Sequence, residues 1–120
     1  MEPASGGEGF PKRARLTKRS EFLTLTREGK RVHTSHFIVL SKRNSVGQSR
    51  LGITVTTRIG HAPARNRIKR LVREFFRRQK KRMIQSSDIV VIAKQGADRL
   101  SLAAVANELG RVLIRGAGQA

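Results

Sequence analysis

Residues 62–82 constrain the fold most, because this segment is apolar along one side and cationic around the rest. Its apolar residues recur at helical spacing, i, i+3, i+4, i+7, i+8 and i+15: Ile68, Leu71, Val72, Phe75, Phe76 and Met83. That spacing predicts one long amphipathic helix whose apolar stripe packs on a sheet. Pro63 suits the first turn of such a helix, since a proline there lacks only an N–H that would have no helical partner.

The same helix carries an excess of cations. Ten of the eighteen residues from Arg65 to Arg82 are Lys or Arg, and Glu74 is the only acid among them. Helices commonly offset cations with carboxylates four residues away, so this segment predicts that negative charge comes from outside the chain. The whole sequence agrees, because 26 Lys and Arg against 8 Asp and Glu give a net charge of +18. A phosphate backbone is the expected partner, ahead of an anionic membrane surface or an acidic protein.

The rest of the pattern predicts one domain of alternating helices and strands. The expected elements are a helix from Thr17 to Glu28, an extended stretch at 33–42 that can split into two strands, a strand at 51–58, a buried strand at 88–93 and a last helix capped by Ser101. This order, α-β-β-β-α-β-α, is typical of an α+β fold, here a two-layer sandwich of a small mixed sheet with helices. Residues 1–14 are expected to be a disordered tail, 15–115 the RNA-binding domain and 116–120 a C-terminal tail.

The sequence shows no arrangement of catalytic or metal-binding residues. It has no cysteine, which excludes disulfides and thiolate metal sites and fits a cytoplasmic location. His33, His36 and His61 are expected on the surface, with His33 and His36 on opposite faces of an extended segment. No carboxylate pair, nucleophile motif or phosphate-binding loop occurs. No apolar run approaches the roughly 20 residues that a membrane span needs. The sequence therefore predicts binding without catalysis by the protein itself.

Residues 52–73, GITVTTRIGHAPARNRIKRLVR, closely resemble the signature of the protein subunit of bacterial ribonuclease P. The family's R-N-R-I-K-R run is matched without a break from Arg65 to Arg70, and Ile59, Gly60, Ala62 and Arg73 match as well. A looser resemblance extends from about Leu16 to Arg115.

The resemblance implies a fold like the second domain of ribosomal protein S5, with a left-handed β-α-β crossover. It also implies the protein component of a ribonucleoprotein that removes the 5′ leader from precursor tRNA. In that family the catalytic RNA carries the chemistry and holds most of the Mg²⁺. The expected partners are therefore the catalytic RNA and precursor tRNA, with no DNA and no membrane. The alternative is a ribosomal or other structural RNA-binding protein of the same fold.

Residue by residue, the resemblance assigns two sites. Contacts to the catalytic RNA are expected from Arg65, Asn66, Arg67, Lys69, Arg70 and Arg73. A leader-binding cleft between the sheet and the first helix is expected to be lined by Phe22, Leu40, Thr54, Thr56 and Arg58. Strand parity also places Thr54, Thr56 and Arg58 on one polar face, whereas core packing is the alternative for Phe22.

Two departures from the family pattern affect the cleft. Leu40 and Thr26 stand where the family usually has aromatic residues. Because base–aromatic stacking contributes roughly 1–3 kcal/mol per base, leader binding is expected to depend here more on charge and backbone contacts. Arg65 and Arg67 lie outside the apolar stripe, so replacing both with Ala is expected to weaken RNA assembly and leave the fold intact.

Overall fold

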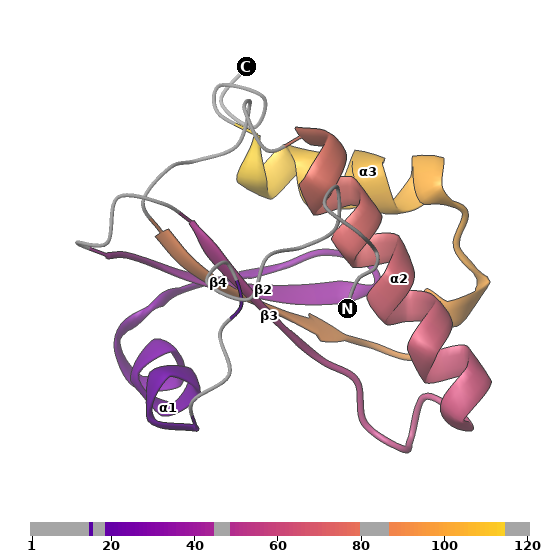
Figure 1. Ribbon diagram of the computed structural model, residues 1–120, viewed down its shortest axis with the longest axis horizontal. Helices are drawn as coiled ribbons and strands as arrows, with labels where there is room; N and C mark the ends of the chain where they lie inside the picture. Colours follow the sequence, from indigo (N-terminus) through magenta and orange to yellow (C-terminus); the bar gives the residue numbers. More distant parts are fainter. Residues whose placement is uncertain (1–14, 16–18, 45–48, 80–86, 115–120) are drawn as a thin grey trace.

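The computed structural model describes Arg15 and residues 19–44, 49–79 and 87–114 (Figure 1). Its elements are α1 (Arg19–Glu28), β1 (Lys30–His33), β2 (Phe37–Arg43), β3 (Arg50–Thr54), α2 (Ala62–Gln79), β4 (Ser87–Ala93), the 3-10 turn η3 (Ala97–Arg99) and α3 (Leu102–Leu113). This is the expected α-β-β-β-α-β-α order with one short turn added before the last helix. The two expected tails, the predicted cap Thr17 and the last stripe residue Met83 lie outside the described residues.

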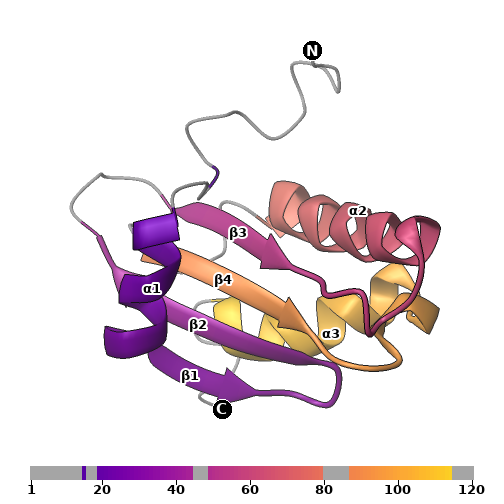
Figure 2. The ribbon, with the colours of Figure 1, turned by 90° about the horizontal axis from the view of Figure 1, so that it is seen from below.

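The strands form one mixed sheet in the order β1-β2-β4-β3. β2 pairs antiparallel with β1 and β4, and β3 pairs parallel with β4. In Figure 2, where α1 lies nearest the viewer, β3 runs from left to right above β4, and the chain returns through α2 behind the sheet. The β3-α2-β4 crossover is therefore left-handed, against the strong general preference, as the resemblance implied.

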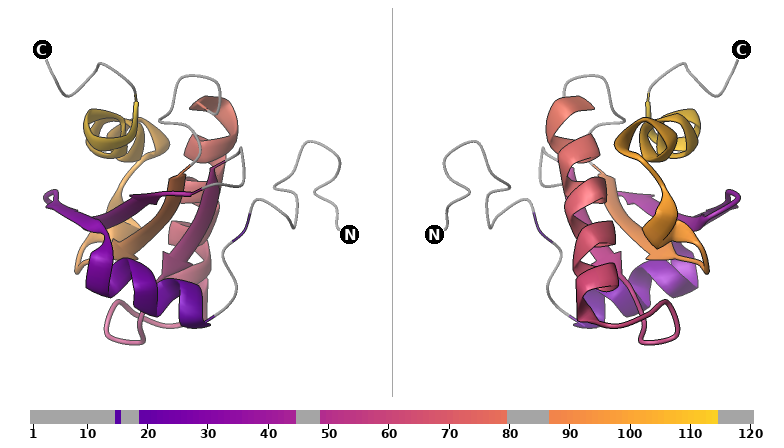
Figure 3. Two further views of the ribbon diagram at one scale, coloured as in Figure 1. Left: turned by 90° about the vertical axis from the view of Figure 1, so that its left-hand side faces the viewer. Right: turned by 90° about the vertical axis from the view of Figure 1, so that its right-hand side faces the viewer.

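Helices cover both faces of the sheet (Figure 3). α2 and α3 bury the main core against one face, and α1 covers part of the other through a small cluster of Leu25, Leu40 and Val90. The expected two layers are the sheet with α2 and α3, and α1 adds a further layer. The reason lies in β4, whose Val90 points to α1 while Ile89 and Val91 point to the main core, so both of its faces need cover.

Local signals placed the two larger helices well. Ile68, Val72, Phe75 and Phe76 of the predicted stripe are buried and Leu71 is half-buried. Ser101 caps α3, with its side-chain oxygen accepting a hydrogen bond from the amide of Ala104 (3.1 Å). Both expectations are confirmed.

Two strand boundaries differ from the expectation. The extended stretch at 33–42 divides at residues 34–36, which turn the chain from β1 into β2. The strand expected at 51–58 ends at Thr54, because the next residues form turns in which Ile59 donates to Thr56 (3.1 Å) and Gly60 donates to Thr57 (3.2 Å). Thr56 and Arg58 therefore lie beyond the strand.

Candidate nucleic-acid interface

Four side chains of α2 form what we call the outer ridge: Asn66, Arg70, Arg73 and Arg77. Their spacing of i, i+4, i+7 and i+11 places them along one line, opposite the buried stripe. All four are exposed. Within the described part of the chain, Asn66 and Arg70 have no side-chain hydrogen bond or ion pair. Their donors are therefore available to an external acceptor.

The far end of the ridge is partly neutralised. Arg77 donates to both carboxylate oxygens of Glu74 (3.1 and 2.6 Å), and the Nε of Arg78 donates to one of them (2.7 Å). These hydrogen bonds lower the pKa of Glu74 to about 2. The expectation that the cations of this helix lack partners is therefore wrong at its last turn, and unpaired charge concentrates nearer its start.

A second segment brings another cation to the ridge. Arg15 forms an isolated parallel bridge with Leu51 beside the free edge of β3. Burial, and after it the charge of Arg15, lowers the pKa of Arg73. Two guanidinium groups close enough to affect one another favour an anion bound nearby. Arg15 thus adds positive charge beside Arg73, whose side chain is partly buried yet exposed overall.

The flanks of α2 are less available than the ridge. Arg65 and Lys69 are half-buried, and the Nε of Arg65 is buried without a hydrogen-bond partner in the described structure. Arg67 is exposed, but its guanidinium donates to the backbone carbonyls of Asp98 (3.0 Å) and Leu100 (2.9 Å). These two hydrogen bonds argue against the expectation that replacing both Arg65 and Arg67 would leave the fold intact.

On the opposite face of the sheet, four residues in register form an open row that crosses all four strands. They are His33 of β1, Ile38 of β2, Ile92 of β4 and Thr54 of β3. His33 is exposed and the other three are half-buried. The next row contains Leu40 and Val90, which Leu25 of α1 covers completely. Among the described residues, the open row is thus a part of this face that α1 leaves partly exposed.

The expected cleft residues are only partly brought together at this row. Phe22 is half-buried and packs on the same cluster as Ile38 and Ile92, so it combines a core role with a position at the edge of the row. Thr54 belongs to the row. Leu40 is only 2% exposed and is not available to an RNA strand in this structure.

The two other expected cleft residues, Thr56 and Arg58, are exposed in the loop after β3. The sequence did not predict that His33, Ile38 and Ile92 share a row with Thr54. Alternation along each strand could show which face of the sheet these residues occupy, but the sequence does not reveal the register that brings them into one row.

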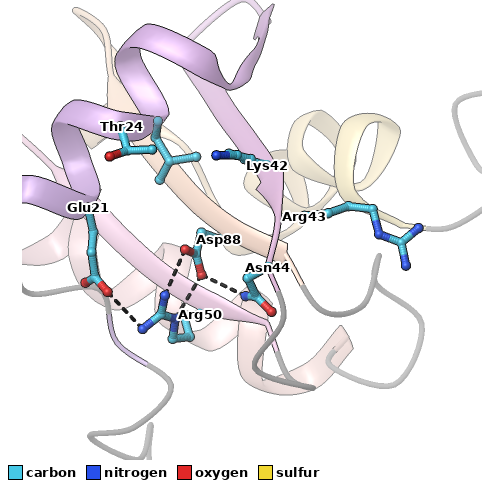
Figure 4. Close-up of a pocket in the computed structure, with 8 residues that line it drawn as sticks. Glu21, Thr24, Lys42, Arg43, Asn44, Arg50 and Asp88 are labelled. Carbon is cyan, nitrogen blue, oxygen red and sulfur yellow. Dashed lines mark hydrogen bonds and ion pairs between the residues drawn. The ribbon is translucent and has the colours of Figure 1, made fainter.

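A polar pocket of about 430 Å³ lies between α1 and the sheet, at the end of this face away from the open row (Figure 4). Arg50 donates to both oxygens of Asp88 (2.8 Å each) and pairs with Glu21 of α1 (3.0 Å), while Asn44 also donates to Asp88 (2.8 Å). The hydrogen bond to Asp88 is the main cause of the raised pKa of Arg50. These interactions join α1 to the sheet, and Lys42 and Arg43 of β2 also line the pocket.

The described residues contain no group of three or more His, Asp or Glu side chains arranged to hold a metal ion. None of the helices in the described ranges is long and apolar enough to cross a membrane.

Comparisons with known proteins agree with this geometry. The model of the ribonuclease P family matches residues 10–116. The ribonuclease P protein component of Geotalea uraniireducens is 44% identical over 106 residues, which cover 88% of this chain and 93% of that one. The solved RNase P protein of Thermotoga maritima is similar with a TM-score of 0.77 at 39% identity, covering 82% of this chain and 94% of that one. That of Staphylococcus aureus gives 0.76 at 34% identity, with 82% and 91% covered.

The resemblance found in residues 52–73 is thereby confirmed over most of the sequence. With the matching fold and the cationic outer ridge, it shows that the chain belongs to the ribonuclease P protein family, the protein subunits of an endoribonuclease that processes tRNA.

Proposed function

We propose that the protein binds the catalytic RNA of ribonuclease P through α2 and the 5′ leader of precursor tRNA through the open row. The contacts on α2 come from Asn66, Arg70 and Arg73 of the outer ridge, supported by Arg65 and Lys69 on its flank. The leader follows the open row past Phe22 toward Thr56 and Arg58. The cytoplasm is the compartment that this function requires.

The observation that carries this proposal is the lack of any side-chain hydrogen bond or ion pair at two residues of the outer ridge, Asn66 and Arg70, in the described structure. A helix that leaves Asn66 and Arg70 without partners, in a chain of net charge +18, stores repulsion that a polyanion relieves. Guanidinium groups also match the geometry of phosphate oxygens, while the amide of Asn66 can both donate to and accept from a ribose or a base edge.

The two surfaces lie close enough to act on one RNA assembly. β3 ends at Thr54 in the open row, and α2 begins only a short loop later at Ala62. That loop carries Arg58, whose side chain is exposed between the two surfaces. A leader lying on the row therefore leaves it beside the start of α2, where the catalytic RNA would be bound.

The open row suits a single strand of RNA. Its centre is apolar at Ile38 and Ile92, which gives bases a surface to lie against. Its two ends carry His33 and Thr54, which can hydrogen-bond to sugars or phosphates. Such a surface reads little sequence, since every base has an apolar face.

We assign the catalytic Mg²⁺ to the RNA subunit. Of the six carboxylates in the described residues, Glu21, Glu28, Glu74 and Asp88 form ion pairs with Lys or Arg, and Glu108 is hydrogen-bonded to Thr34 and His36. Hard cations such as Mg²⁺ prefer free carboxylates, phosphates and water as ligands. The role of the protein is then to reduce repulsion between two folded RNAs and so favour Mg²⁺ and substrate binding.

Leader removal from precursor tRNA by the catalytic RNA, at low Mg²⁺ and with or without the protein, tests this function. Faster cleavage with protein is expected, and no acceleration would contradict the proposal. The ridge is tested by Arg70→Ala, which should reduce the dependence of log K on log salt for catalytic-RNA binding by about 0.7–0.9. Arg27→Ala on α1 removes the same charge from the opposite face of the sheet and serves as the matched control.

A further inference from the structure

Arg67 lies on the side of α2 that faces η3, away from the outer ridge. Its Nε donates to the carbonyl of Asp98 (3.0 Å) and its Nη2 donates to the carbonyl of Leu100 (2.9 Å). Both carbonyls sit where η3 ends and the chain enters α3. A planar guanidinium has the rigid fork that spans two such acceptors at once.

The turn that Arg67 holds is also tied to the loop between the two RNA surfaces. The side-chain amide of Gln95 donates to the carbonyl of Arg58 (3.0 Å). Gly96, at a φ of 91°, then directs the chain into η3. Residues 95–100 are therefore fastened on one side to α2 through Arg67 and on the other to the loop that carries Arg58.

We propose that Arg67 is a positioning residue that acts through residues 95–100 and does not itself contact an RNA phosphate. The inference rests on the proposed function, because it concerns which cations of α2 meet the RNA. Two donors of Arg67 point at the protein backbone, whereas Asn66 and Arg70 keep their donors free in the described structure. Removing Arg67 frees the η3 turn and, through Gln95, loosens the support of Arg58.

The salt dependence of catalytic-RNA binding separates this role from a phosphate contact. Each phosphate neutralised adds about 0.7–0.9 to the slope of log K against log salt. Arg67→Ala should leave that slope unchanged while lowering the melting temperature of the free protein by roughly 5 °C. Arg70→Ala, one helical turn away on the ridge, should lower the slope and leave the melting temperature unchanged.

Arg67→Lys separates the effect of the forked guanidinium from the effect of its positive charge. Lysine keeps the positive charge but cannot span both carbonyls, so this variant should melt as low as Arg67→Ala and should keep the wild-type salt slope. The ratio of holoenzyme affinity for precursor tRNA to that for mature tRNA provides the functional readout. That ratio should fall several-fold in Arg67→Ala, should not be rescued in Arg67→Lys, and should also fall in Gln95→Ala, which removes the other attachment of the same turn.

The inference is overturned if Arg67→Ala lowers the salt slope with no loss of melting temperature, or if Arg67→Lys restores the affinity ratio. Should Arg67→Ala fail to fold, the same measurements on Arg67→Lys decide the question. An unchanged slope in Arg70→Ala overturns the ridge assignment of the proposed function, and the Arg67 inference is then still decided by the melting temperatures and the lysine rescue.

Discussion

The ring Nδ1 of His36 lies 2.5 Å from a carboxylate oxygen of Glu108, although 72 residues separate them in the chain. Glu108 also accepts hydrogen bonds from the hydroxyl of Thr34 (2.7 Å) and the amide of His36 (2.9 Å). A single carboxylate of α3 therefore holds the turn between β1 and β2, and with it the His33 end of the open row.

This attachment should make stability depend on pH. Burial raises the pKa of Glu108, but hydrogen bonds from the His36 ring, the Thr34 hydroxyl and the His36 amide outweigh it, so the net pKa lies below the ordinary 4.5. Because the folded-state pKa is depressed, the stabilisation is complete above about pH 4.5 and is lost as the pH falls through the lowered value. Glu108→Gln should therefore cost about 1–3 kcal/mol at pH 7 and progressively less below pH 4.5. Thermal unfolding followed by circular dichroism at pH 7 and pH 3 measures the difference in stability between Glu108→Gln and the wild-type protein.

Asp98→Asn is the matched control for that experiment, because no side-chain hydrogen bond or ion pair is formed by Asp98 in the described structure. It should change stability little at either pH. A Glu108→Gln penalty that is the same at pH 7 and pH 3 would show that the lost carboxylate charge is not its cause.

The ion pairs beneath α1 should be unequal in strength. Asp88 accepts two hydrogen bonds from Arg50 and one from Asn44, whereas Glu21 makes one ion pair with Arg50. Asp88→Ala leaves the half-buried guanidinium of Arg50 poorly compensated and should cost about 2–3 kcal/mol in urea unfolding. Glu21→Ala should cost less than about 1 kcal/mol. Equal costs for the two variants would contradict this ranking.

Two glycines should respond oppositely to alanine. A Cβ on Gly29 would lie 2.7 Å from the carbonyl oxygen of Leu25 and 3.0 Å from that of Ser41, both rigid backbone atoms. Gly29→Ala should therefore destabilise the protein by about 1–3 kcal/mol. Gly110 lies within α3, where the nearest atom to an added Cβ is the end of the Ile114 side chain at 3.4 Å. Gly110→Ala should gain about 0.5–1 kcal/mol, and urea unfolding of the pair checks the contrast.

The features that could be predicted from the sequence are local ones. The stripe of α2 and the Ser101 cap are periodic or short-range signals, and both appear where expected. The strand order and the left-handed crossover depend on pairing between distant segments, and only the family resemblance supplied the crossover. His36 was expected to be an ordinary surface residue, because nothing near it in the sequence reveals Glu108.

In the candidate site, too, local features could be predicted from the sequence and contacts between distant segments could not. Helical periodicity placed Asn66 and Arg70 outside the apolar stripe of α2, but it treated Arg67 as equivalent to its neighbours. The backbone carbonyls that hold Arg67 lie about thirty residues further on and carry no sequence signature. Leu40 was assigned to the cleft by the family resemblance, and nothing in the sequence of β2 shows that α1 covers Leu40 while Ile38 stays partly exposed.

The difference in exposure between Ile38 and Leu40 gives a direct test of the open row. Ile38 is half-buried at the row, so Ile38→Tyr places an aromatic ring where a leader base can stack. Because stacking contributes roughly 1–3 kcal/mol per base, the holoenzyme should bind precursor tRNA at least about fivefold more tightly and mature tRNA with unchanged affinity.

Leu40→Phe is the matched control, since it adds an aromatic ring to the same strand two residues away. Leu40 is enclosed by Leu25 and Val90 beneath α1, so the larger side chain has no route to the leader and must instead displace its neighbours. This variant should lose about 1–3 kcal/mol of stability and gain no leader affinity. The opposite result would be tighter binding of precursor tRNA by Leu40→Phe and no change in Ile38→Tyr. In that case α1 would have to move away from the sheet when the leader binds, and the leader would lie over the row of Leu40 and Val90 instead of the open row.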